Sequence, residues 1–281
     1  MIWQTKTRTF DLKRRALMMG IVNLTPNSFS DGGQFLEVEA ACWQADRLAS
    51  EGATIIDVGG ESTRPGAEPV DEEEELRRVM PVIERLAGDP RFVISVDTMK
   101  PGVAKAAIAA GAEVVNDVSG LRSEAMVEVV RSTGVGVIVM HMKGTPMDMQ
   151  ISPFYVDVVE EVREFFRQRF EACVKYGIDP LCMAFDPGIG FGKTLAHNLA
   201  LVRSLGGLEI EGRPIVLGVS RKSFIGGAIG SDRGEDRAWP TVALTSYGRT
   251  RGVKVFRVHE VRANFEALRM TEAILGEESG G

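Results

Sequence analysis

The sequence is poor in cysteine and contains no long apolar run. Its three cysteines, Cys42, Cys173 and Cys182, are odd in number and lack the paired spacing of metal ligands, so neither a disulfide framework nor a zinc site is predicted. No apolar run approaches the roughly 20 residues of a membrane-spanning helix, and the first residues contain no apolar signal core. These absences predict a cytoplasmic protein without a membrane partner.

Basic residues are also in the minority. The chain has 33 Lys and Arg against 39 Asp and Glu, a formal net charge of −6 over 281 residues, and it contains no basic block. A nucleic-acid surface needs Lys and Arg clustered on one face. The composition therefore argues against a nucleic-acid partner, and any anionic ligand must bind in a local basic pocket.

Short β-branched apolar runs alternate with longer segments of helical period from residue 16 to the end. Eight strands are expected, at 17–22, 54–58, 93–96, 113–116, 135–140, 182–185, 215–218 and 253–256. Eight helices are expected, at 38–50, 72–86, 103–110, 124–132, 153–176, 199–205, 240–250 and 261–275. This pattern predicts an α/β fold in which residues 1–281 form a single (β/α)8 TIM-barrel domain. An open doubly wound sheet, which usually has fewer strands, is the alternative.

The two ends of the chain and one acidic run have simple expected roles. Residues 1–15 are predicted to be a polar lead-in strand or arm, and residues 276–281 a flexible tail. The acidic run 71–75 is expected to be the solvated first turn of a helix, where negative charge meets the helix dipole favourably.

Three glycine-containing stretches approach known motifs but do not match them. Residues 192–194, GKT, have the sequence that ends a P-loop, but Pro187 stands where that motif requires glycine. The stretch 188–192 lacks the spacing of a dinucleotide fingerprint and follows the sixth predicted strand rather than the first. The stretch 218–222 contains the serine of a hydrolase elbow but ends in lysine instead of glycine.

Polar residues follow each predicted strand, where the loops of a barrel converge on one face. Asp97, Asp117 and Asp186 end three of the strands, and Asn116 precedes one of them. A single aspartate at such a position often caps the next helix, but three favour a shared pocket. Carboxylates and a carboxamide suit a ring edge with several N–H donors, such as that of a pterin or a guanine.

Cations and hydroxyl groups also follow the strands. Any one of the cations is typical of a solvated surface, whereas together they predict an anion site that binds a phosphorylated or diphosphorylated substrate. The residues are Arg64, Lys222, Arg257 and His259, with the hydroxyls of Ser62, Thr63 and Ser220. The connections after the first two strands exceed the usual 2 to 6 residues or so, which predicts mobile lids.

Seven motifs occur in one order along the chain, from about residue 19 to 261. They are NLTPNSFSDGG, DVGGESTRPGA, SVDT, NDVSG, FDPGIGFGK, GVSRKSFIG and RVHEV, and they closely resemble the dihydropteroate synthase family. The resemblance implies a homodimeric (β/α)8 barrel that joins 6-hydroxymethyl-7,8-dihydropterin diphosphate to 4-aminobenzoate and releases diphosphate with Mg2+ present. Asn27 departs from the Asp that many members have, so it is assigned no essential charged role.

The resemblance also implies roles for individual residues. The catalytic set would be Asp97, Asp186, Lys222, Arg257 and His259. The pterin and its diphosphate would contact this set together with Thr63, Asn116, Val118, Met140, Phe191 and Gly218. The aminobenzoate would be framed by Phe29, Thr63, Arg64, Pro65 and Ser223, and Asn23 would contact Mg2+ or diphosphate.

The chemistry implied by the resemblance is a dissociative, SN1-like substitution, because the electron-rich reduced pterin can delocalise a cation on its CH2 group. Two alternatives remain at this point. A pterin-binding methyltransferase domain would share the barrel, although the two long loops argue against it. A barrel that only binds pterin would not need the full set of charged residues.

Overall fold

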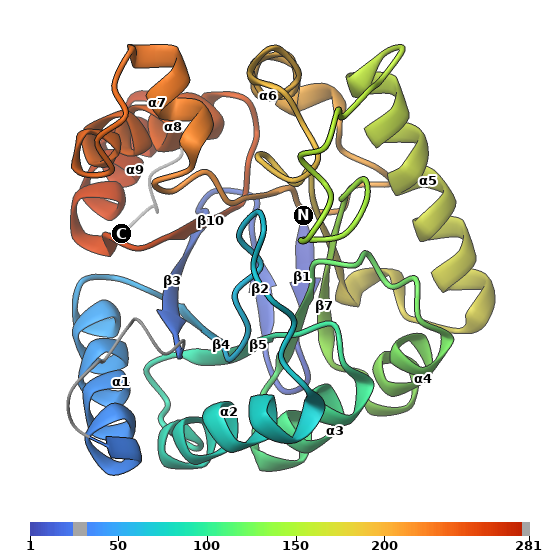
Figure 1. Ribbon diagram of the computed structural model, residues 1–281, viewed down its shortest axis with the longest axis vertical. Coiled ribbons are helices and arrows are strands. Elements are labelled where there is room, and N and C mark those ends of the chain that lie inside the picture. Colours follow the sequence, from blue (N-terminus) through green and yellow to red (C-terminus); the bar gives the residue numbers. More distant parts are fainter. Residues whose placement is uncertain (25–32, 277–281) are drawn as a thin grey trace.

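Eight parallel strands form a barrel with the helices arranged around it (Figure 1). The protein is represented by a computed structural model that describes residues 1–24 and 33–276. The strand order is β8-β7-β6-β5-β4-β3-β10-β9, and a parallel bridge between Phe185 and Ile215 joins the two ends. The strands are β3 (Leu17–Asn23), β4 (Ile55–Gly59), β5 (Val93–Asp97), β6 (Val114–Asp117), β7 (Gly136–Met140), β8 (Met183–Asp186), β9 (Val216–Leu217) and β10 (Val255–Val258). The predicted (β/α)8 barrel is confirmed.

The helices follow the strands in alternation. They are α1 (Gly33–Ser50), α2 (Glu72–Leu86), α3 (Pro101–Ala110), α4 (Glu124–Thr133), α5 (Val158–Tyr176), α6 (Leu195–Arg203), α7 (Ser223–Ile229), α8 (Ala238–Thr250) and α9 (Val261–Ile274), with short 3-10 turns at Pro180–Cys182, Leu205–Gly207 and Glu235–Arg237. None of the helices in the described ranges is long and apolar enough to cross a membrane.

Four helix predictions need correction. The helices predicted at 38–50 and 199–205 begin earlier, at Gly33 and Leu195, and the second ends at Arg203. The segment between the seventh and eighth strands contains α7 as well as the predicted helix at 240–250. The helix predicted at 153–176 begins only at Val158, because the Asp157 carboxylate accepts hydrogen bonds from the Val159 and Glu160 N–H groups at 2.9 and 3.2 Å. The connection 141–157 is therefore a third long loop at the carboxyl end of the barrel.

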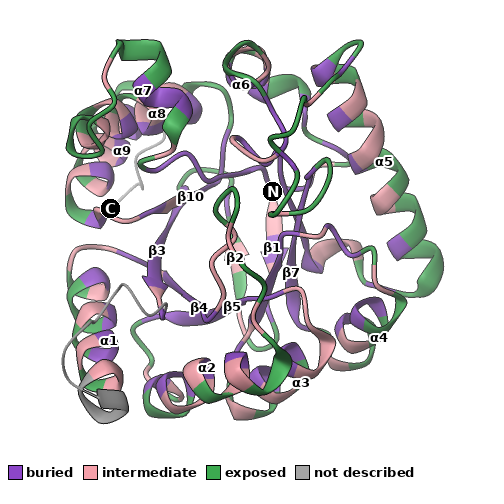
Figure 2. Cartoon of the chain, in the orientation of Figure 1, coloured by how far each residue is buried: buried purple, intermediate pink, exposed green. Residues whose placement is uncertain are grey.

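Strand alternation produces two apolar layers. In β6, Val114 belongs to the cluster inside the barrel, whereas Val115 belongs to the larger cluster between strands and helices. Leu17 and Met18 divide in the same way in β3. Figure 2 shows the strands as the buried centre and the outer helix faces as the exposed surface. This alternation decides which polar side chain at a strand end points into the barrel.

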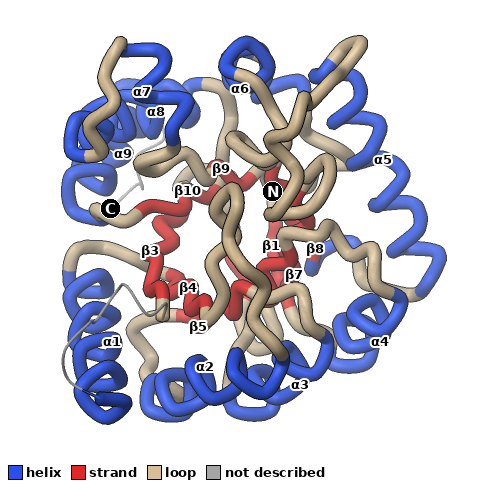
Figure 3. The backbone as a smooth tube through the Cα atoms, in the orientation of Figure 1, coloured by secondary structure: helices blue, strands red, loops and turns tan. Residues whose placement is uncertain are grey.

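The amino-terminal segment, predicted as a polar lead-in strand or arm, forms two strands and buries apolar side chains. It forms an antiparallel hairpin of β1 (Ile2–Gln4) and β2 (Thr9–Asp11) that lies against the strand ring (Figure 3). Trp3 is fully buried in the inner cluster and donates a hydrogen bond from Nε1 to the Cys182 carbonyl at 3.0 Å. The hairpin therefore closes the amino-terminal end of the barrel with apolar side chains and leaves the carboxyl end for ligands.

The acidic run 71–75 is only partly the solvated helix start that was predicted. Asp71 caps α2 by accepting a hydrogen bond from the Glu74 N–H at 2.7 Å. Glu75, however, is fully buried, and its carboxylate pairs with Lys100. A buried carboxylate requires such a partner, which the local sequence pattern does not reveal.

Candidate active site

The pairing of neighbouring strands brings predicted site residues from five strands, four of them polar, to the carboxyl mouth of the barrel. Asn23 pairs with Gly59, Gly59 with Asp97, and Asp97 with Asn116, while Met140 pairs with Asp186 on the other side. These positions have the same parity as the inner apolar cluster, so their side chains point into the barrel. The predicted residues Asn23, Asp97, Asn116, Met140 and Asp186 therefore lie around one mouth.

Arg257, on β10, lies at the centre of a network of charged side chains. Its Nε donates to Asp57 Oδ2 at 2.6 Å and its Nη2 donates to Asp97 Oδ2 at 2.7 Å. Asn116 Nδ2 also donates to Asp57 Oδ2, at 3.2 Å. The other oxygens, Asp57 Oδ1 and Asp97 Oδ1, are buried and have no hydrogen-bond partner among the described residues. The network thus presents two free acceptor atoms beside one shared guanidinium.

Burial and charge set the ionisation of this network. Burial raises the pKa of Asp97 to about 7 against the opposing effect of Arg257, and the nearby Asp57 raises it further. Burial lowers the pKa of Arg257, but Asp57 and Asp97 outweigh that effect and raise it above its usual value. Arg257 is therefore a fixed cation, while Asp97 titrates near neutral pH.

Asp186 and Lys222 form a second charged group across the mouth. Asp186 Oδ1 accepts a hydrogen bond from the Gly188 N–H at 2.7 Å, and Lys222 Nζ donates to the Ile189 carbonyl at 2.6 Å. The same Nζ lies 4.4 Å from the centroid of the Phe191 ring. Burial lowers the pKa of Lys222 to about 8, with Asp186 opposing this effect. Burial likewise raises the pKa of Asp186, with Lys222 opposing it.

An apolar wall lies beside these charged groups. Val118 and Met140 are buried in a small cluster with Met142 and Met149, and Phe191 packs against it. A Cβ added to Gly218 would lie 3.4 Å from Asp186 Oδ2, so only glycine leaves that space open. The mouth therefore combines a flat apolar surface with acceptor atoms, as a planar heterocycle with N–H donors requires.

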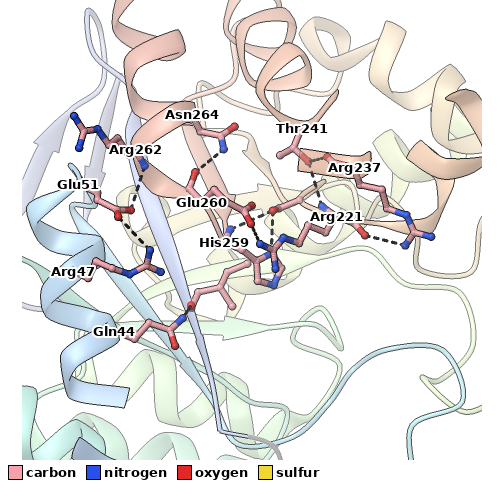
Figure 4. A network of polar contacts seen from close by, with 12 residues as sticks. Gln44, Arg47, Glu51, Arg221, Arg237, Thr241, His259, Glu260, Arg262 and Asn264 are labelled. Carbon is pink, nitrogen blue, oxygen red and sulfur yellow. Dashed lines mark hydrogen bonds and ion pairs between the residues drawn. The ribbon is translucent and has the colours of Figure 1, made fainter. Parts of the chain in front are cut away.

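His259 belongs to a polar network at the end of β10 (Figure 4). Its Nδ1 lies 2.9 Å from Ser220 Oγ, and its backbone N–H donates to the same oxygen at 3.2 Å. Burial lowers the pKa of His259 to about 3, and Arg257, Arg221 and other nearby cations lower it further. His259 is therefore a neutral hydrogen-bonding group in the free protein, not the cation that the sequence suggested.

Arg221 is a neighbouring cation that the sequence analysis did not single out. Its φ of 58° lies in the left-handed region, which non-glycine residues rarely adopt. Its guanidinium pairs with Glu260, and its backbone N–H donates to Thr241 Oγ1 at 3.3 Å. The strained turn at Arg221 thus connects Ser220, which contacts His259, with Lys222. Arg221 therefore belongs to the part of the mouth where the cations gather.

The second long loop, 60–71, is fastened at its base. The Glu61 carboxylate accepts from Val70 N–H at 3.1 Å and pairs with Lys100, which also binds the buried Glu75. At its tip, the Gly66 N–H donates to the Pro146 carbonyl at 3.0 Å. Thr63, Arg64 and Pro65 lie between these fixed points, half-buried in the first case and exposed in the other two.

Two more residues, Ser223 and Phe29, are predicted to contact the aminobenzoate. Ser223 is exposed at the first position of α7, one residue after Lys222. Phe29 lies outside the described residues, as do Asn27 and most of the first long loop. The structure therefore brings Ser223 near the charged mouth but places neither Phe29 nor Asn27.

Asp117 is the clearest wrong site prediction. It has the outward parity of Val115, and its two carboxylate oxygens accept from the Ser119 and Leu121 N–H groups at 2.7 and 2.9 Å. It caps the following turn and does not enter the mouth. Asp57 takes its place in the network, and the signal that identifies it is a charged residue two positions after the inward-facing Ile55.

Asn23 is the residue predicted to meet a metal ion. No group of three or more His, Cys, Asp or Glu side chains within residues 1–24 and 33–276 has the arrangement of a metal site. A Cβ built on Gly59 would lie 3.8 Å from Asn23 Oδ1 and 3.7 Å from Asp97 Oδ2, so these oxygens face one space. A single carboxamide oxygen fits Mg2+ that takes its other ligands from phosphate and water.

A separate cleft of about 530 Å3 lies beside α5 and the 141–157 connection. Its lining includes Arg122, His141, Lys143, Tyr155 and Phe165. None of the predicted site residues lines it. The chemistry-bearing groups therefore gather at the barrel mouth rather than in this peripheral cleft.

Known proteins resemble this chain in both sequence and fold. The pterin binding enzyme family matches residues 19–259. The dihydropteroate synthase of Neisseria meningitidis serogroup C is 43% identical over 277 residues, which cover 97% of each chain. A structure of Xanthomonas albilineans dihydropteroate synthase with 4-aminobenzoic acid is 45% identical, with a TM-score of 0.91 and 98% of each chain covered. Another from the same organism, in complex with 7,8-dihydropteroate, is 42% identical, with a TM-score of 0.87 and coverage of 98% of this chain and 99% of that chain.

Proposed function

Because this chain belongs to the dihydropteroate synthases of the pterin-binding enzyme family, we propose that it joins 6-hydroxymethyl-7,8-dihydropterin diphosphate to 4-aminobenzoate. The resemblance of the seven sequence motifs is thereby confirmed, and the protein is a transferase. The observation that carries the substrate proposal is the division of charge in the mouth. Buried carboxylates with free acceptor atoms lie beside the half-buried Arg257 and Lys222.

The carboxylate side suits the pterin ring. Its N–H groups donate to Asp97 Oδ1 and to the Asp186 carboxylate, with the ring against Met140 and Phe191. Negative charge at this edge favours positive charge that develops on the ring and its CH2 group when the C–O bond breaks. These residues therefore stabilise the cation of a dissociative substitution.

The cation side suits the diphosphate. The electron pair of the breaking C–O bond goes to a diphosphate oxygen, where Arg257 and Lys222 offset its charge. His259 contributes a hydrogen bond, and the arriving anion raises its pKa from the low value that the surrounding cations impose. Asn23 would hold Mg2+, which supplies additional charge neutralisation on the phosphate oxygens.

The second substrate needs positioning rather than covalent catalysis. The amine of 4-aminobenzoate is nucleophilic in its neutral form, attacks the CH2 carbon and loses a proton to the medium as the C–N bond forms. Thr63, Arg64 and Pro65 are held by the fastened second loop, and Ser223 lies one residue after Lys222. We assign these residues to orienting the aminobenzoate, with Arg64 binding its carboxylate.

The pH dependence of pterin diphosphate binding is the first prediction. Affinity should be highest between about pH 7, where Asp97 ionises, and about pH 8, where Lys222 loses its proton. Below this window Asp97 is protonated, and it must lose that proton before it can accept a hydrogen bond from the pterin ring. Above the window Lys222 loses its proton and becomes neutral. Calorimetry from about pH 5.5 to about pH 9.5 measures both limbs, because binding is linked to each ionisation. A flat profile would contradict the assignment of these two groups.

Arg64→Ala tests whether Arg64 binds the aminobenzoate and not the pterin diphosphate. We expect little change in pterin diphosphate affinity in calorimetry, because Arg64 is exposed and acts on the diphosphate side only as one of several cations near His259. The KM for 4-aminobenzoate should rise about 10- to 100-fold, the effect of losing one charge-assisted pair. Arg85→Ala, another exposed arginine, is the control. A wild-type KM in the Arg64 variant would remove it from the site.

We also propose that the enzyme is a cytoplasmic homodimer. Its three cysteines are free and buried, as a reducing compartment allows. Leu195 on α6, Ile229 on α7 and Trp239 on α8 are exposed large apolar residues. These three helices lie at one end of the molecule (Figure 1). Light scattering should give twice the 30.6 kDa chain mass, and a Trp239→Glu variant should shift it toward the monomer.

The proposed reaction is tested by identifying its products. Both substrates are incubated with the enzyme and Mg2+, and the mixture is analysed by mass spectrometry and a diphosphate assay. Equal amounts of 7,8-dihydropteroate and diphosphate are expected. Binding of pterin diphosphate without any product would contradict the proposal and leave only a pterin-binding barrel.

A further inference from the structure

Lys193 is a buried lysine to which the proposed reaction gives no role. Its side chain is only 3% exposed, and Asp186 is the carboxylate whose charge acts on it. Its Nζ lies 2.9 Å from the Gly188 carbonyl, 2.9 Å from the Phe191 carbonyl, 3.0 Å from His141 Nδ1 and 3.3 Å from the His141 carbonyl. It is the lysine of the GKT sequence, yet its ammonium group points into the protein.

The groups around Lys193 can accept hydrogen bonds from its side-chain nitrogen. Burial lowers the pKa of His141 to about 2, and Lys193 lowers it further, so the imidazole is neutral and its Nδ1 can accept a hydrogen bond. Burial lowers the pKa of Lys193 well below its usual value, with Asp186 opposing that effect. Isolated burial of a cation is costly, and the four acceptors around Nζ offset part of that cost.

Two of the carbonyl groups that Lys193 binds, those of Gly188 and Phe191, belong to the loop 187–192, which forms one wall of the mouth. Gly188 and Gly192 both have a φ of 63°, and a Cβ on Gly188 would lie 1.9 Å from the His141 carbonyl oxygen. The loop therefore lies directly against the end of β7. A side chain at Gly188 would push it away from that strand.

The same loop makes three of the contacts that shape the mouth. Gly188 donates its N–H to Asp186, and the Ile189 carbonyl accepts from Lys222. The Phe191 ring lies under the Lys222 ammonium. Lys193 binds the carbonyl groups of Gly188 and Phe191, which bracket these contacts.

We propose that Lys193 is a positioning residue that fixes the loop 187–192 on His141 and thereby holds Asp186, Lys222 and Phe191 in the arrangement that binds the pterin ring. This inference rests on the proposed function, because it assigns the ring to that wall. Lys193 itself touches neither substrate. It acts through the backbone of the loop, so its effect falls on the pterin and not on the aminobenzoate.

Lys193→Met tests this inference, because methionine keeps most of the volume and removes every donor. Pterin diphosphate should bind about 10- to 100-fold more weakly in calorimetry, the effect of losing hydrogen bonds from a charged donor. The KM for 4-aminobenzoate, measured at saturating pterin diphosphate, should remain that of the wild type. A general loss of structure would raise both constants, so this split separates positioning from stability.

Arg213→Met is the matched control. Arg213 is also a buried cation that donates to backbone carbonyl groups, those of Ile2 and Pro180 at 3.1 and 3.2 Å, but at the amino-terminal end of the barrel. The Arg213→Met variant should retain wild-type affinity for pterin diphosphate even if its thermal stability falls. Equal losses of pterin affinity in the two variants would overturn the proposal.

A second variant covers the case in which Lys193→Met does not fold. Lys193→Gln keeps an amide donor on a shorter side chain that cannot reach all four acceptors, and the same weakening of pterin binding is expected. Wild-type affinity in whichever variant folds overturns the positioning role. Failure of the wild-type protein to bind pterin diphosphate would instead overturn the proposed function.

Discussion

Pterin diphosphate binding should fall by roughly 100-fold or more in Asp97→Ala and in Lys222→Ala, because each change removes one hydrogen-bonding charge from the mouth. Asp97 supplies the free acceptor Oδ1 and holds Arg257 through Oδ2. Lys222 is the cation that lies between the Ile189 carbonyl and the Phe191 ring. Isothermal titration calorimetry measures the loss directly, without depending on turnover.

Each of these variants has a matched control in the same fold. Asp117→Ala removes an aspartate of the neighbouring strand that faces the opposite way and caps a turn. Lys254→Ala removes a lysine that is 8% exposed and donates to the Lys13 carbonyl at 3.4 Å, at the other end of the barrel. Both controls should bind pterin diphosphate as the wild type does. Wild-type affinity in Asp97→Ala and Lys222→Ala would refute the pocket.

Arg257→Met should combine loss of turnover with a large loss of stability. The guanidinium is the shared partner of Asp57 and Asp97, which are both buried, and its removal leaves them unpaired. Removing one partner of a buried ion pair costs about 3–5 kcal/mol in the free energy of unfolding. Urea unfolding measures this cost, and diphosphate release measures the turnover.

The stability loss in Arg257→Met should depend on pH in a definite direction. The pKa of Asp97 in the folded protein is about 7, above its ordinary value of 3.8, so folding favours the protonated carboxyl group. This contribution is complete below about pH 4 and is lost as the pH rises through about 7. Without Arg257 the pKa of Asp97 rises further, so the penalty should grow from acidic to alkaline pH. A penalty that grows on acidification would contradict this explanation.

An accompanying double variant tests the same charge argument. Asp57→Asn in the Arg257→Met background removes one of the two unpaired charges, and part of the lost stability should return. The asparagine still accepts from Asn116 Nδ2, which now donates to Asp57 at 3.2 Å. No recovery would mean that lost packing, not unpaired charge, causes the instability.

The sequence was sufficient for the barrel and for most of the polar groups at its mouth. Eight apolar runs with helical segments between them have few ways to bury their surfaces, and loops at one barrel end converge whatever their sequence. Asp97, Asn116, Asp186, Lys222 and Arg257 could be found for that reason. Their position at strand ends is a local property that the sequence displays.

Side-chain direction was harder to predict than position. Asp57 and Asp117 both belong to strands, but only Asp57 has the parity of the inner cluster and meets Arg257. Parity depends on the strand register, which a run of consecutive valines and isoleucines does not reveal. Counting every second residue from the inward-facing Ile55 and Val114 would have predicted that Asp57 points into the barrel and that Asp117 points away from it.

Long-range partners could not be predicted from local patterns at all. Trp3 lies in the barrel because its hairpin closes the amino-terminal end, which a polar segment of fifteen residues conceals. Glu75 looks like part of a solvated acidic turn until Lys100 is brought beside it. Lys193 has the sequence of a phosphate-binding motif, but its partners are the His141 ring and three carbonyl groups.

The most direct test of the account is an assay of diphosphate release in which each substrate is omitted in turn. We predict rapid release only when pterin diphosphate and 4-aminobenzoate are both present, with one 7,8-dihydropteroate formed for each diphosphate. Pterin diphosphate alone should give only slow release through hydrolysis, and 4-aminobenzoate alone should give none. Release that proceeds at the same rate without 4-aminobenzoate, or no release with both substrates, would contradict the proposed condensation.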